Sequence, residues 1–253
     1  MRVTMPGNSS DSKTQAPIPR GATSSLVDDH QSSASDISAF VAKARALAPK
    51  RSGSNGRLVF ALDATMSRQP TWDMACRLQA DMFREAGNIG GLDVRLVYFR
   101  GLNECRASPW ISDTGQLARL MSRIHVEGGH TQIGRVLGET RREAVKEGVR
   151  ALVFVGDAME ENLDDLCARA GELGLLKVPC FMFQEGGDPV AENAFREIAR
   201  LSGGAWCRFD PGAAAQLREL LRAVAAYAAG GREALARLSQ TERGASALLT
   251  QLR

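Results

Sequence analysis

The chain has 253 residues, of which 44% are hydrophobic and 24% are charged, and its formal net charge is +3. These values are typical of a globular protein, and the length leaves room for one α/β domain with tails or for two small domains. So small a net charge argues against nucleic acid as a partner. The five cysteines include no CxxC pair, which favours reduced thiols over a disulfide framework. Without a signal-peptide core or an apolar run of roughly 20 residues, we expect a cytoplasmic protein with no membrane partner.

The first 56 residues are predicted to precede the main domain as two segments. Residues 1–35 are rich in Ser, Asp, Gln and Pro, and we expect them to be disordered. Residues 36–56 are predicted to form a short helix that Pro49 ends, followed by a linker. Lys43, Arg45, Lys50 and Arg51 make this segment basic. A solvated linker is the favoured interpretation, and a phosphate-binding or nucleic-acid-binding patch is the alternative.

Apolar strand patterns and amphipathic helix patterns alternate over residues 57–230. Strands are predicted at 58–62, 94–99, 151–155, 178–183 and 205–209, and helices at 70–86, 114–124, 133–147 and 163–175. Two further helices begin at the Asp-Pro pairs 188–189 and 210–211 and end at the Gly-Gly pairs 203–204 and 230–231. This alternation predicts an α/β domain with a doubly wound, mostly parallel sheet and helices on both faces. Residues 231–253 are predicted to be a helical tail interrupted at Gly244.

Oxygen-bearing side chains follow the predicted strands, where ligands bind in such sheets. Asp63, Thr65 and Ser67 follow the first strand, and Asp157 follows the strand at 151–155. Thr131 lies in the loop Gly128–Gln132, directly before a helix. Mg²⁺ and Mn²⁺ prefer oxygen ligands. The sequence therefore predicts a metal site made by these five residues, and no catalytic residue is assigned.

The motif Asp63-x-Thr65-x-Ser67, Thr131 in a Gly-Gly-x-Thr loop, and Asp157 after an apolar strand resemble the metal-ion-dependent adhesion site (MIDAS) of von Willebrand factor A (VWA) domains. The segment 198–204 and the Leu-rich last helix also look like this family, so the resemblance covers residues 57–229. It implies a Rossmann-like, six-stranded sheet with a short antiparallel edge strand near residues 103–110. Thr65 stands where the family most often has serine. Threonine keeps the hydroxyl of serine and adds a methyl group.

The resemblance also implies the roles and the function. The hydroxyls of Thr65, Ser67 and Thr131 would face Mg²⁺ or Mn²⁺ directly, and Asp63 and Asp157 would bind it directly or through water. An open coordination position would then accept a Glu or Asp carboxylate from a partner protein, so the chain would be a non-enzymatic interaction module. Bacterial intracellular members of the family are often accessories of ATPases or chaperone-type machines, which makes such a machine the candidate partner by analogy.

Other interpretations remain beside this one. The alternative function is a metal-dependent phosphohydrolase that uses Asp63 and Asp157. The glycines of 129–134 have P-loop spacing, but Arg135 and Val136 replace the required Lys and Ser/Thr. We expect His130 to be solvated, and we favour a core position for Trp110 over an exposed contact. The acidic run 157–161 is expected to place charge at a helix N-terminus, with Glu160 as a candidate rim residue of the metal site.

Overall fold

The structure is a computed structural model that describes residues 56–69, 72, 92–209 and 214–252. The predicted tail and helix of residues 1–55 and most of the helix predicted at 70–86 lie outside the described residues. The same is true of the predicted Asp-Pro cap at 210–211.

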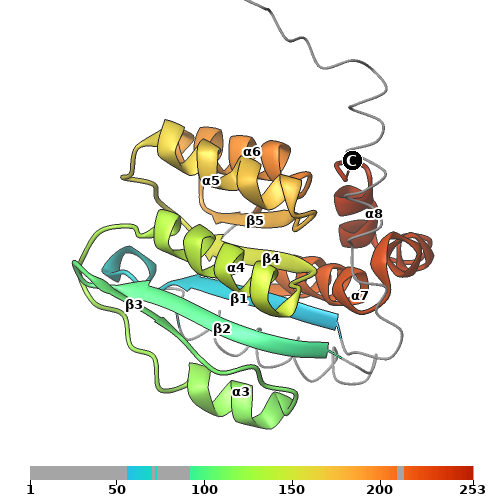
Figure 1. Cartoon of the computed structure of the whole chain (residues 1–253), viewed down its shortest axis with the longest axis horizontal. Helices are drawn as coiled ribbons and strands as arrows, with labels where there is room; N and C mark the ends of the chain where they lie inside the picture. The colour runs from blue at the N-terminus through green and yellow to red at the C-terminus, as the bar shows by residue number, and fades with distance from the viewer. Residues whose placement is uncertain (1–55, 70–71, 73–91, 210–213, 253) are drawn as a thin grey trace, which may run out of the picture. The chain divides into compact units, whose positions relative to one another are not determined.

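A six-stranded sheet forms the centre of the described part of the chain (Figure 1). Its strands are β1 (Gly56–Asp63), β2 (Leu92–Arg100), β3 (Glu104–Ala107), β4 (Ala151–Gly156), β5 (Cys180–Glu185) and β6 (Ala205–Phe209). The order across the sheet is β3-β2-β1-β4-β5-β6, and every neighbouring pair is parallel except β2 with β3. This confirms the doubly wound, mostly parallel sheet, including the antiparallel edge strand.

Helices cover both faces of this sheet because its central strands alternate apolar side chains between two cores. Val59 and Ala61 of β1 face a core shared with α4 (Ile133–Glu147), α5 (Leu163–Leu175) and α6 (Pro189–Ser202). Leu58, Phe60 and Leu62 face a core shared with α3 (Thr114–Met121), α7 (Ala214–Leu238) and α8 (Arg243–Leu249). None of the helices described here combines the length and apolar character needed to cross a membrane.

Most predicted boundaries agree with the observed elements, and the exceptions have local causes. α6 begins as predicted, since the Asp188 carboxylate accepts a hydrogen bond from the Ala191 amide at 2.7 Å and Pro189 occupies the first turn. β5 begins at Cys180 rather than Val178. The Val178 amide instead donates to the Leu173 carbonyl at 2.9 Å, which holds this residue in the turn that follows α5.

The C-terminal residues are helical, with one break inside α7 and one turn between α7 and α8. Gly231 has φ 69° and ψ −162°, so α7 breaks at the predicted Gly-Gly pair. The predicted interruption at Gly244 was wrong, because the chain turns before this residue and Gly244 lies inside α8. A Cβ on Gly244 would come within 3.0 Å of the Glu219 Cβ, so its missing side chain allows α8 to pack closely on α7. Leu248 of α8 is fully buried in the same core as α7.

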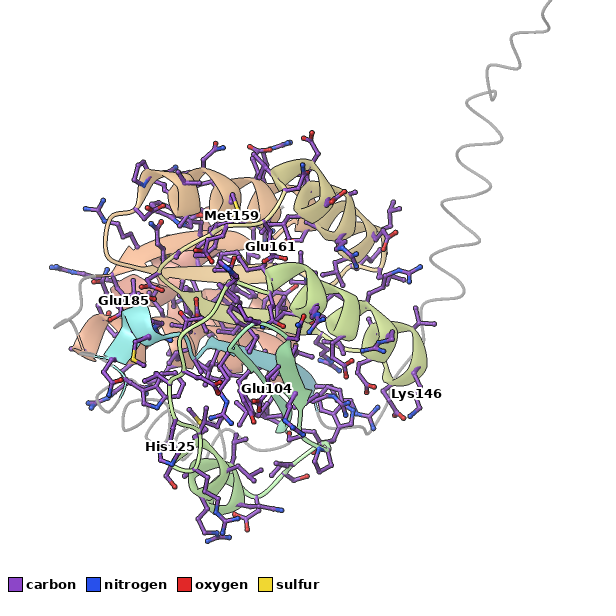
Figure 2. The ribbon with its side chains drawn as sticks, turned by 90° about the vertical axis from the view of Figure 1, so that its left-hand side faces the viewer. Glu104, His125, Lys146, Met159, Glu161 and Glu185 are labelled. Carbon is purple, nitrogen blue, oxygen red and sulfur yellow. The ribbon has the colours of Figure 1, made fainter. Side chains whose placement is uncertain are left out.

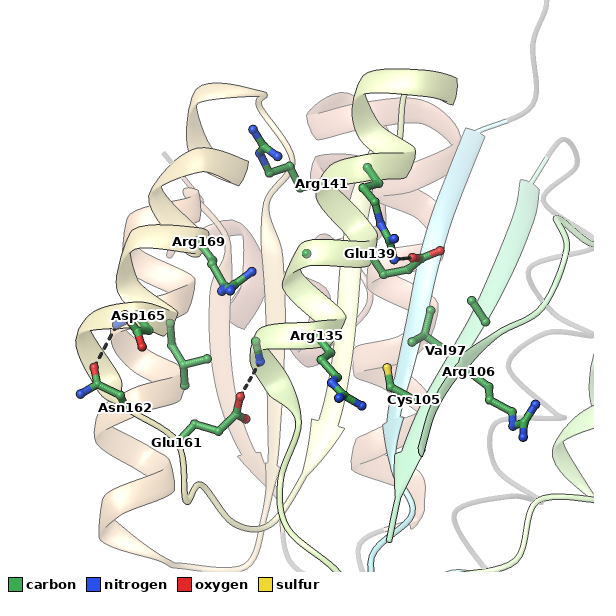
Figure 3. Close-up of a pocket in the computed structure, with 15 residues that line it drawn as sticks. Val97, Cys105, Arg106, Arg135, Glu139, Arg141, Glu161, Asn162, Asp165 and Arg169 are labelled. Carbon is green, nitrogen blue, oxygen red and sulfur yellow. Dashed lines mark hydrogen bonds and ion pairs between the residues drawn. The ribbon is translucent and has the colours of Figure 1, made fainter. Parts of the chain in front are cut away.

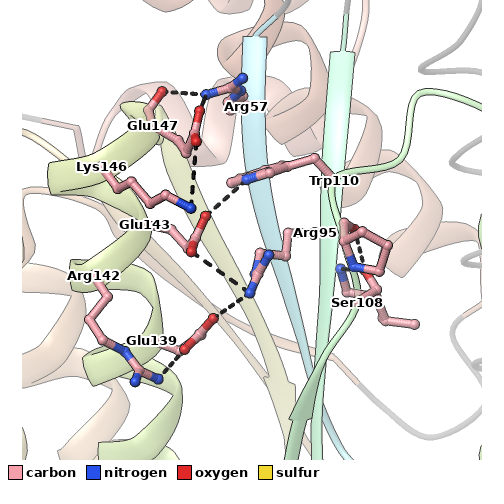
Figure 4. Close-up of polar contacts among 11 residues, drawn as sticks. Arg57, Arg95, Ser108, Trp110, Glu139, Arg142, Glu143, Lys146 and Glu147 are labelled. Carbon is pink, nitrogen blue, oxygen red and sulfur yellow. Dashed lines mark hydrogen bonds and ion pairs between the residues drawn. The ribbon is translucent and has the colours of Figure 1, made fainter.

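A polar network links β1, β2 and the segment after β3 to α4 (Figure 4). The Arg95 guanidinium pairs with Glu139 at 2.7 Å and with Glu143 at 3.7 Å. The indole N–H of Trp110 donates to Glu143 at 2.9 Å, and the Arg57 guanidinium lies 5.4 Å from the centre of its ring. Trp110 is half-buried against the core, so its expected burial is only partial.

Candidate metal centre

The carboxyl edge of the sheet brings four of the five predicted metal-binding residues into contact. Asp63 is the last residue of β1, and Asp157 directly follows β4, the parallel neighbour of β1. The turn after β1 is a 3₁₀ helix, η1 (Met66–Arg68). Thr65 directly precedes this helix, and Ser67 lies within it. The Ser67 hydroxyl donates to the Asp157 carboxylate at 3.1 Å and lies 3.1 Å from the Thr65 hydroxyl.

Asp63 carries the most unusual group of the site. Its side chain is fully buried, and Oδ1 accepts a hydrogen bond from the Thr65 amide at 2.8 Å. Oδ2 has no hydrogen-bond partner in the described part of the chain. Burial raises the pKa of Asp63 to about 6 and also raises the pKa of the half-buried Asp157. A buried carboxylate oxygen without a partner is unfavourable, and a cation is the kind of group that would satisfy it.

Thr131 lies on the neighbouring loop and is held there by Glu160. The Thr131 amide donates to the Glu160 carboxylate at 3.0 Å, and the Thr131 hydroxyl accepts from the Glu160 amide at 2.9 Å. An isolated bridge between Thr65 and Glu127 sets this loop beside the turn after β1. Within the described residues, no hydrogen bond joins Thr131 directly to the other four candidates. The Thr131 hydroxyl oxygen has a second lone pair, which could bind a cation.

The acidic run 157–161 has a role that the sequence did not resolve. The Glu161 carboxylate accepts hydrogen bonds from the Ile133 and Gly134 amides, the latter at 2.9 Å. Its charge therefore lies at the N-terminus of α4, as the helix dipole favours, although α4 precedes the run in the sequence. Glu160 and Glu161 together clamp the loop that carries Thr131. This pairing joins segments almost 30 residues apart, so no local pattern indicated it.

Two further residues of the site were missed by sequence reasoning. Arg68 follows Ser67 directly and has a fully buried side chain, which pairs with Glu185 at the end of β5. Figure 2 labels Glu185 beside the cyan ribbon of β1 and the turn that follows it. The charge of Arg68 lowers the pKa of Asp63 and of Asp157, which partly opposes the effect of burial.

The predicted solvation of His130 is confirmed, since its side chain is 69% exposed, with Nδ1 3.2 Å from the Glu160 carboxylate.

The chemistry of these groups fits a hard divalent cation. Two carboxylates and three hydroxyls are the oxygen donors that Mg²⁺ and Mn²⁺ accept. Among the described residues, no group of three or more His, Cys, Asp or Glu side chains is arranged to hold a metal. The two findings are compatible, because three of the five candidate ligands are hydroxyls.

A cavity of about 850 Å³ lies along α4 (Figure 3). It is lined by Glu161, Arg135 and Arg169, among others, and by Cys105 of β3. None of the five candidate metal-binding residues lines it. The candidate metal centre and the cavity are therefore distinct features that share only the Glu161 clamp.

No family model matches the sequence, and a search among curated proteins finds no relative. Several solved structures have a fold similar to that of this chain. The von Willebrand factor type A protein from Catenulispora acidiphila has a TM-score of 0.57 and 20% identity, over 70% of this chain and 43% of that chain. The SpRpn10 VWA domain has a TM-score of 0.52 and 13% identity, over 62% of this chain and 89% of that chain.

A third structure is that of proximal thread matrix protein 1 from the mussel byssus with a zinc-occupied MIDAS motif. It has a TM-score of 0.57 and 14% identity, over 68% of this chain and 46% of that chain. This chain thus spans less than half of the C. acidiphila and mussel proteins. At such identities the similarity establishes the fold, and the described part of this chain adopts the von Willebrand factor A fold.

Proposed function

We propose that this protein is a non-enzymatic interaction module that binds a divalent cation, Mg²⁺ or Mn²⁺, and through it an acidic side chain of a partner protein in the cytoplasm. Asp63, Thr65, Ser67, Thr131 and Asp157 would hold the cation. The carrying observation is the buried Oδ2 of Asp63, which has no hydrogen-bond partner in the described residues. The same residue begins a series of contacts that runs from the Thr65 amide through the Thr65 and Ser67 hydroxyls to the Asp157 carboxylate.

The donor set supports weak and reversible cation binding. Hydroxyl ligands are neutral, so the two aspartates are the only charged members of the proposed set, and several coordination positions would be left to water. A bound cation would supply a position at which a Glu or Asp carboxylate of the partner can replace water. The zinc-occupied MIDAS motif of the mussel protein, whose fold is similar, supports a divalent-cation site in this chain.

Calorimetric titration of Mg²⁺ and of Mn²⁺ into chelator-treated protein tests the cation site. We expect binding in the wild type and none in Asp63→Asn, which keeps the size of the side chain and its acceptor for the Thr65 amide. Ser67→Ala serves as a second variant, because Ser67 is exposed and its loss does not threaten folding. Asp165→Asn, an exposed residue of α5, is the matched control and should bind as the wild type does. Equal binding by wild type and Asp63→Asn would refute the site.

The partner half of the proposal needs its own measurement. Metal-loaded protein is used as bait, and the captured proteins are compared with those captured after chelation and with those captured by Ser67→Ala. We expect a partner that is retained only with the cation and only by the wild type. Replacing the acidic residues of the partner's contact segment by amides should release it. A partner retained equally well after chelation would contradict binding through the cation.

A further inference from the structure

Arg68 is the largest of the fully buried side chains in the described part of the chain. A guanidinium group keeps its charge at every pH of interest, so its burial is costly unless it is paired and hydrogen-bonded. The residue directly follows Ser67, one of the proposed cation ligands. The interactions that keep Arg68 buried therefore act on the turn that carries the ligands.

The guanidinium group has two different anchor points. Nη1 donates to the main-chain carbonyl of Asp63 at 3.0 Å. Nε and Nη2 each lie 2.8 Å from one carboxylate oxygen of Glu185, the last residue of β5, whose side chain is only 5% exposed. Since β5 lies two strands from β1 in the sheet, the pair ties the end of β1 to a separate rigid strand.

The rest of the turn closes around the same side chain. The Arg68 amide donates to the Thr65 carbonyl at 3.2 Å, which closes η1. The guanidinium carbon lies 5.7 Å from the centre of the Trp72 ring, and the Trp72 indole N–H donates to the Ile124 carbonyl at 3.0 Å. Thr65 and Ser67 thus lie between two main-chain points, at Asp63 and Arg68, which are both fixed by one buried side chain.

We propose that Arg68 is a positioning residue for the cation site, which it preforms by bracing the turn 63–68 against Glu185. This inference rests on the proposed function, since it concerns the affinity of the same cation site. An arginine is required because its planar fork donates in two directions at once, to Asp63 and to Glu185, whereas a lysine has a single ammonium group. Without the brace, ordering the turn would have to accompany cation binding, and the affinity would fall.

The alternative is that the pair contributes only to folding. A structural role predicts that a variant which remains folded binds Mg²⁺ as the wild type does. A positioning role predicts weaker binding in folded protein. Cation affinity and thermal stability must therefore be measured on the same variants.

The test uses the full chain after chelator treatment, with Mg²⁺ alone as the probe. Arg68→Lys keeps the charge and loses the fork, and we expect its Mg²⁺ affinity to fall at least tenfold. Arg57→Lys is the matched control, because Arg57 pairs with Glu147 and Asp93 at the start of β1, at the opposite edge of the sheet. The Mg²⁺ affinity of Arg57→Lys should stay within twofold of that of the wild type, even where its Tm falls.

Hydrogen exchange of the metal-free protein gives a second readout. The Thr65 amide, which donates to Asp63 Oδ1, should exchange at least tenfold faster in Arg68→Lys than in the wild type or in Arg57→Lys. If Arg68→Lys does not fold, Glu185→Asp withdraws the carboxylate by one methylene group and should lower the Mg²⁺ affinity by about threefold to tenfold.

The outcomes separate the two proposals. Folded Arg68→Lys with Mg²⁺ affinity and Thr65 exchange equal to those of the wild type would overturn the positioning role and leave the cation site intact. If Arg68→Lys does not fold, an unchanged Mg²⁺ affinity of Glu185→Asp would likewise overturn the positioning role. A wild type that binds neither Mg²⁺ nor Mn²⁺ would overturn the proposed function and this inference with it.

Discussion

Gly129 lies where two loops of the candidate site touch through their backbones. A Cβ at this position would come 2.0 Å from the Gly101 carbonyl oxygen and 2.5 Å from the Gly101 Cα. Ordinary C···O contacts are not shorter than about 3.3 Å, so Gly129→Ala creates an overlap of more than ~1 Å. The contact is with backbone, which cannot move aside as a flexible side chain could.

The cost of Gly129→Ala follows from what must move. Overpacking of this kind costs about 1–3 kcal/mol. The Gly101 carbonyl also accepts from the His130 amide and from the Gln132 side chain, each at 3.3 Å. Loss of both hydrogen bonds adds about 0.5–1.5 kcal/mol for each. We therefore expect the free energy of unfolding to fall by about 2–6 kcal/mol, with weaker Mg²⁺ binding because Thr131 is two residues away.

Gly128 provides the control for this prediction. A Cβ on Gly128 would have no atom within 4 Å apart from those of its two chain neighbours, so Gly128→Ala should change the free energy of unfolding by no more than about 1 kcal/mol. Urea denaturation followed by circular dichroism measures both variants on the same protein. A stability difference below about 0.5 kcal/mol between Gly129→Ala and Gly128→Ala would refute the reasoning from loop contact.

Three other predictions concern the site, the thiols and the C-terminal helix. Asp63→Asn should raise the thermal stability of the metal-free protein at pH 7 while abolishing Mg²⁺ binding. The reason is that burying a carboxylate whose Oδ2 has no hydrogen-bond partner among the described residues is unfavourable, and a lower Tm would contradict this. Burial raises the pKa of the Cys105 thiol from 9.0 to about 11, so at pH 8 its thiolate is about a hundredfold scarcer than in an unfolded chain. Alkylation of Cys105 by iodoacetamide, followed by peptide mass spectrometry, should therefore be slow in folded protein and rise about tenfold per pH unit up to pH 10. Rates equal to those in urea would count against the raised pKa of this thiol. Leu248→Ala should cost about 2–5 kcal/mol in urea denaturation, since the side chain is fully buried in the core shared with α7, and a loss below about 1 kcal/mol would mean that α8 does not belong to that core.

Much of the fold was predictable because it is encoded locally. The apolar run of β4 lies in the sheet centre and needs both faces covered, so its composition alone indicates a buried parallel strand. The Asp188-Pro189 start and the Gly203 end of α6 follow from hydrogen bonds and a left-handed φ that only a few residue types provide. The error at Gly244 has the opposite origin. A glycine in a helical pattern signals a break, and only the close approach of α8 to α7 explains why it lies inside the helix.

The sequence by itself determined the alternation of strands and helices and the five oxygen-bearing candidates, because strand ends in a parallel sheet converge on one edge. Only the tertiary structure decided which groups support those candidates. Glu160 and Glu161 clamp a loop almost 30 residues earlier in the chain, and Glu185 pairs with Arg68 across 117 residues. A charged side chain is ordinarily expected to be exposed, and its burial depends on a partner that no local pattern can specify.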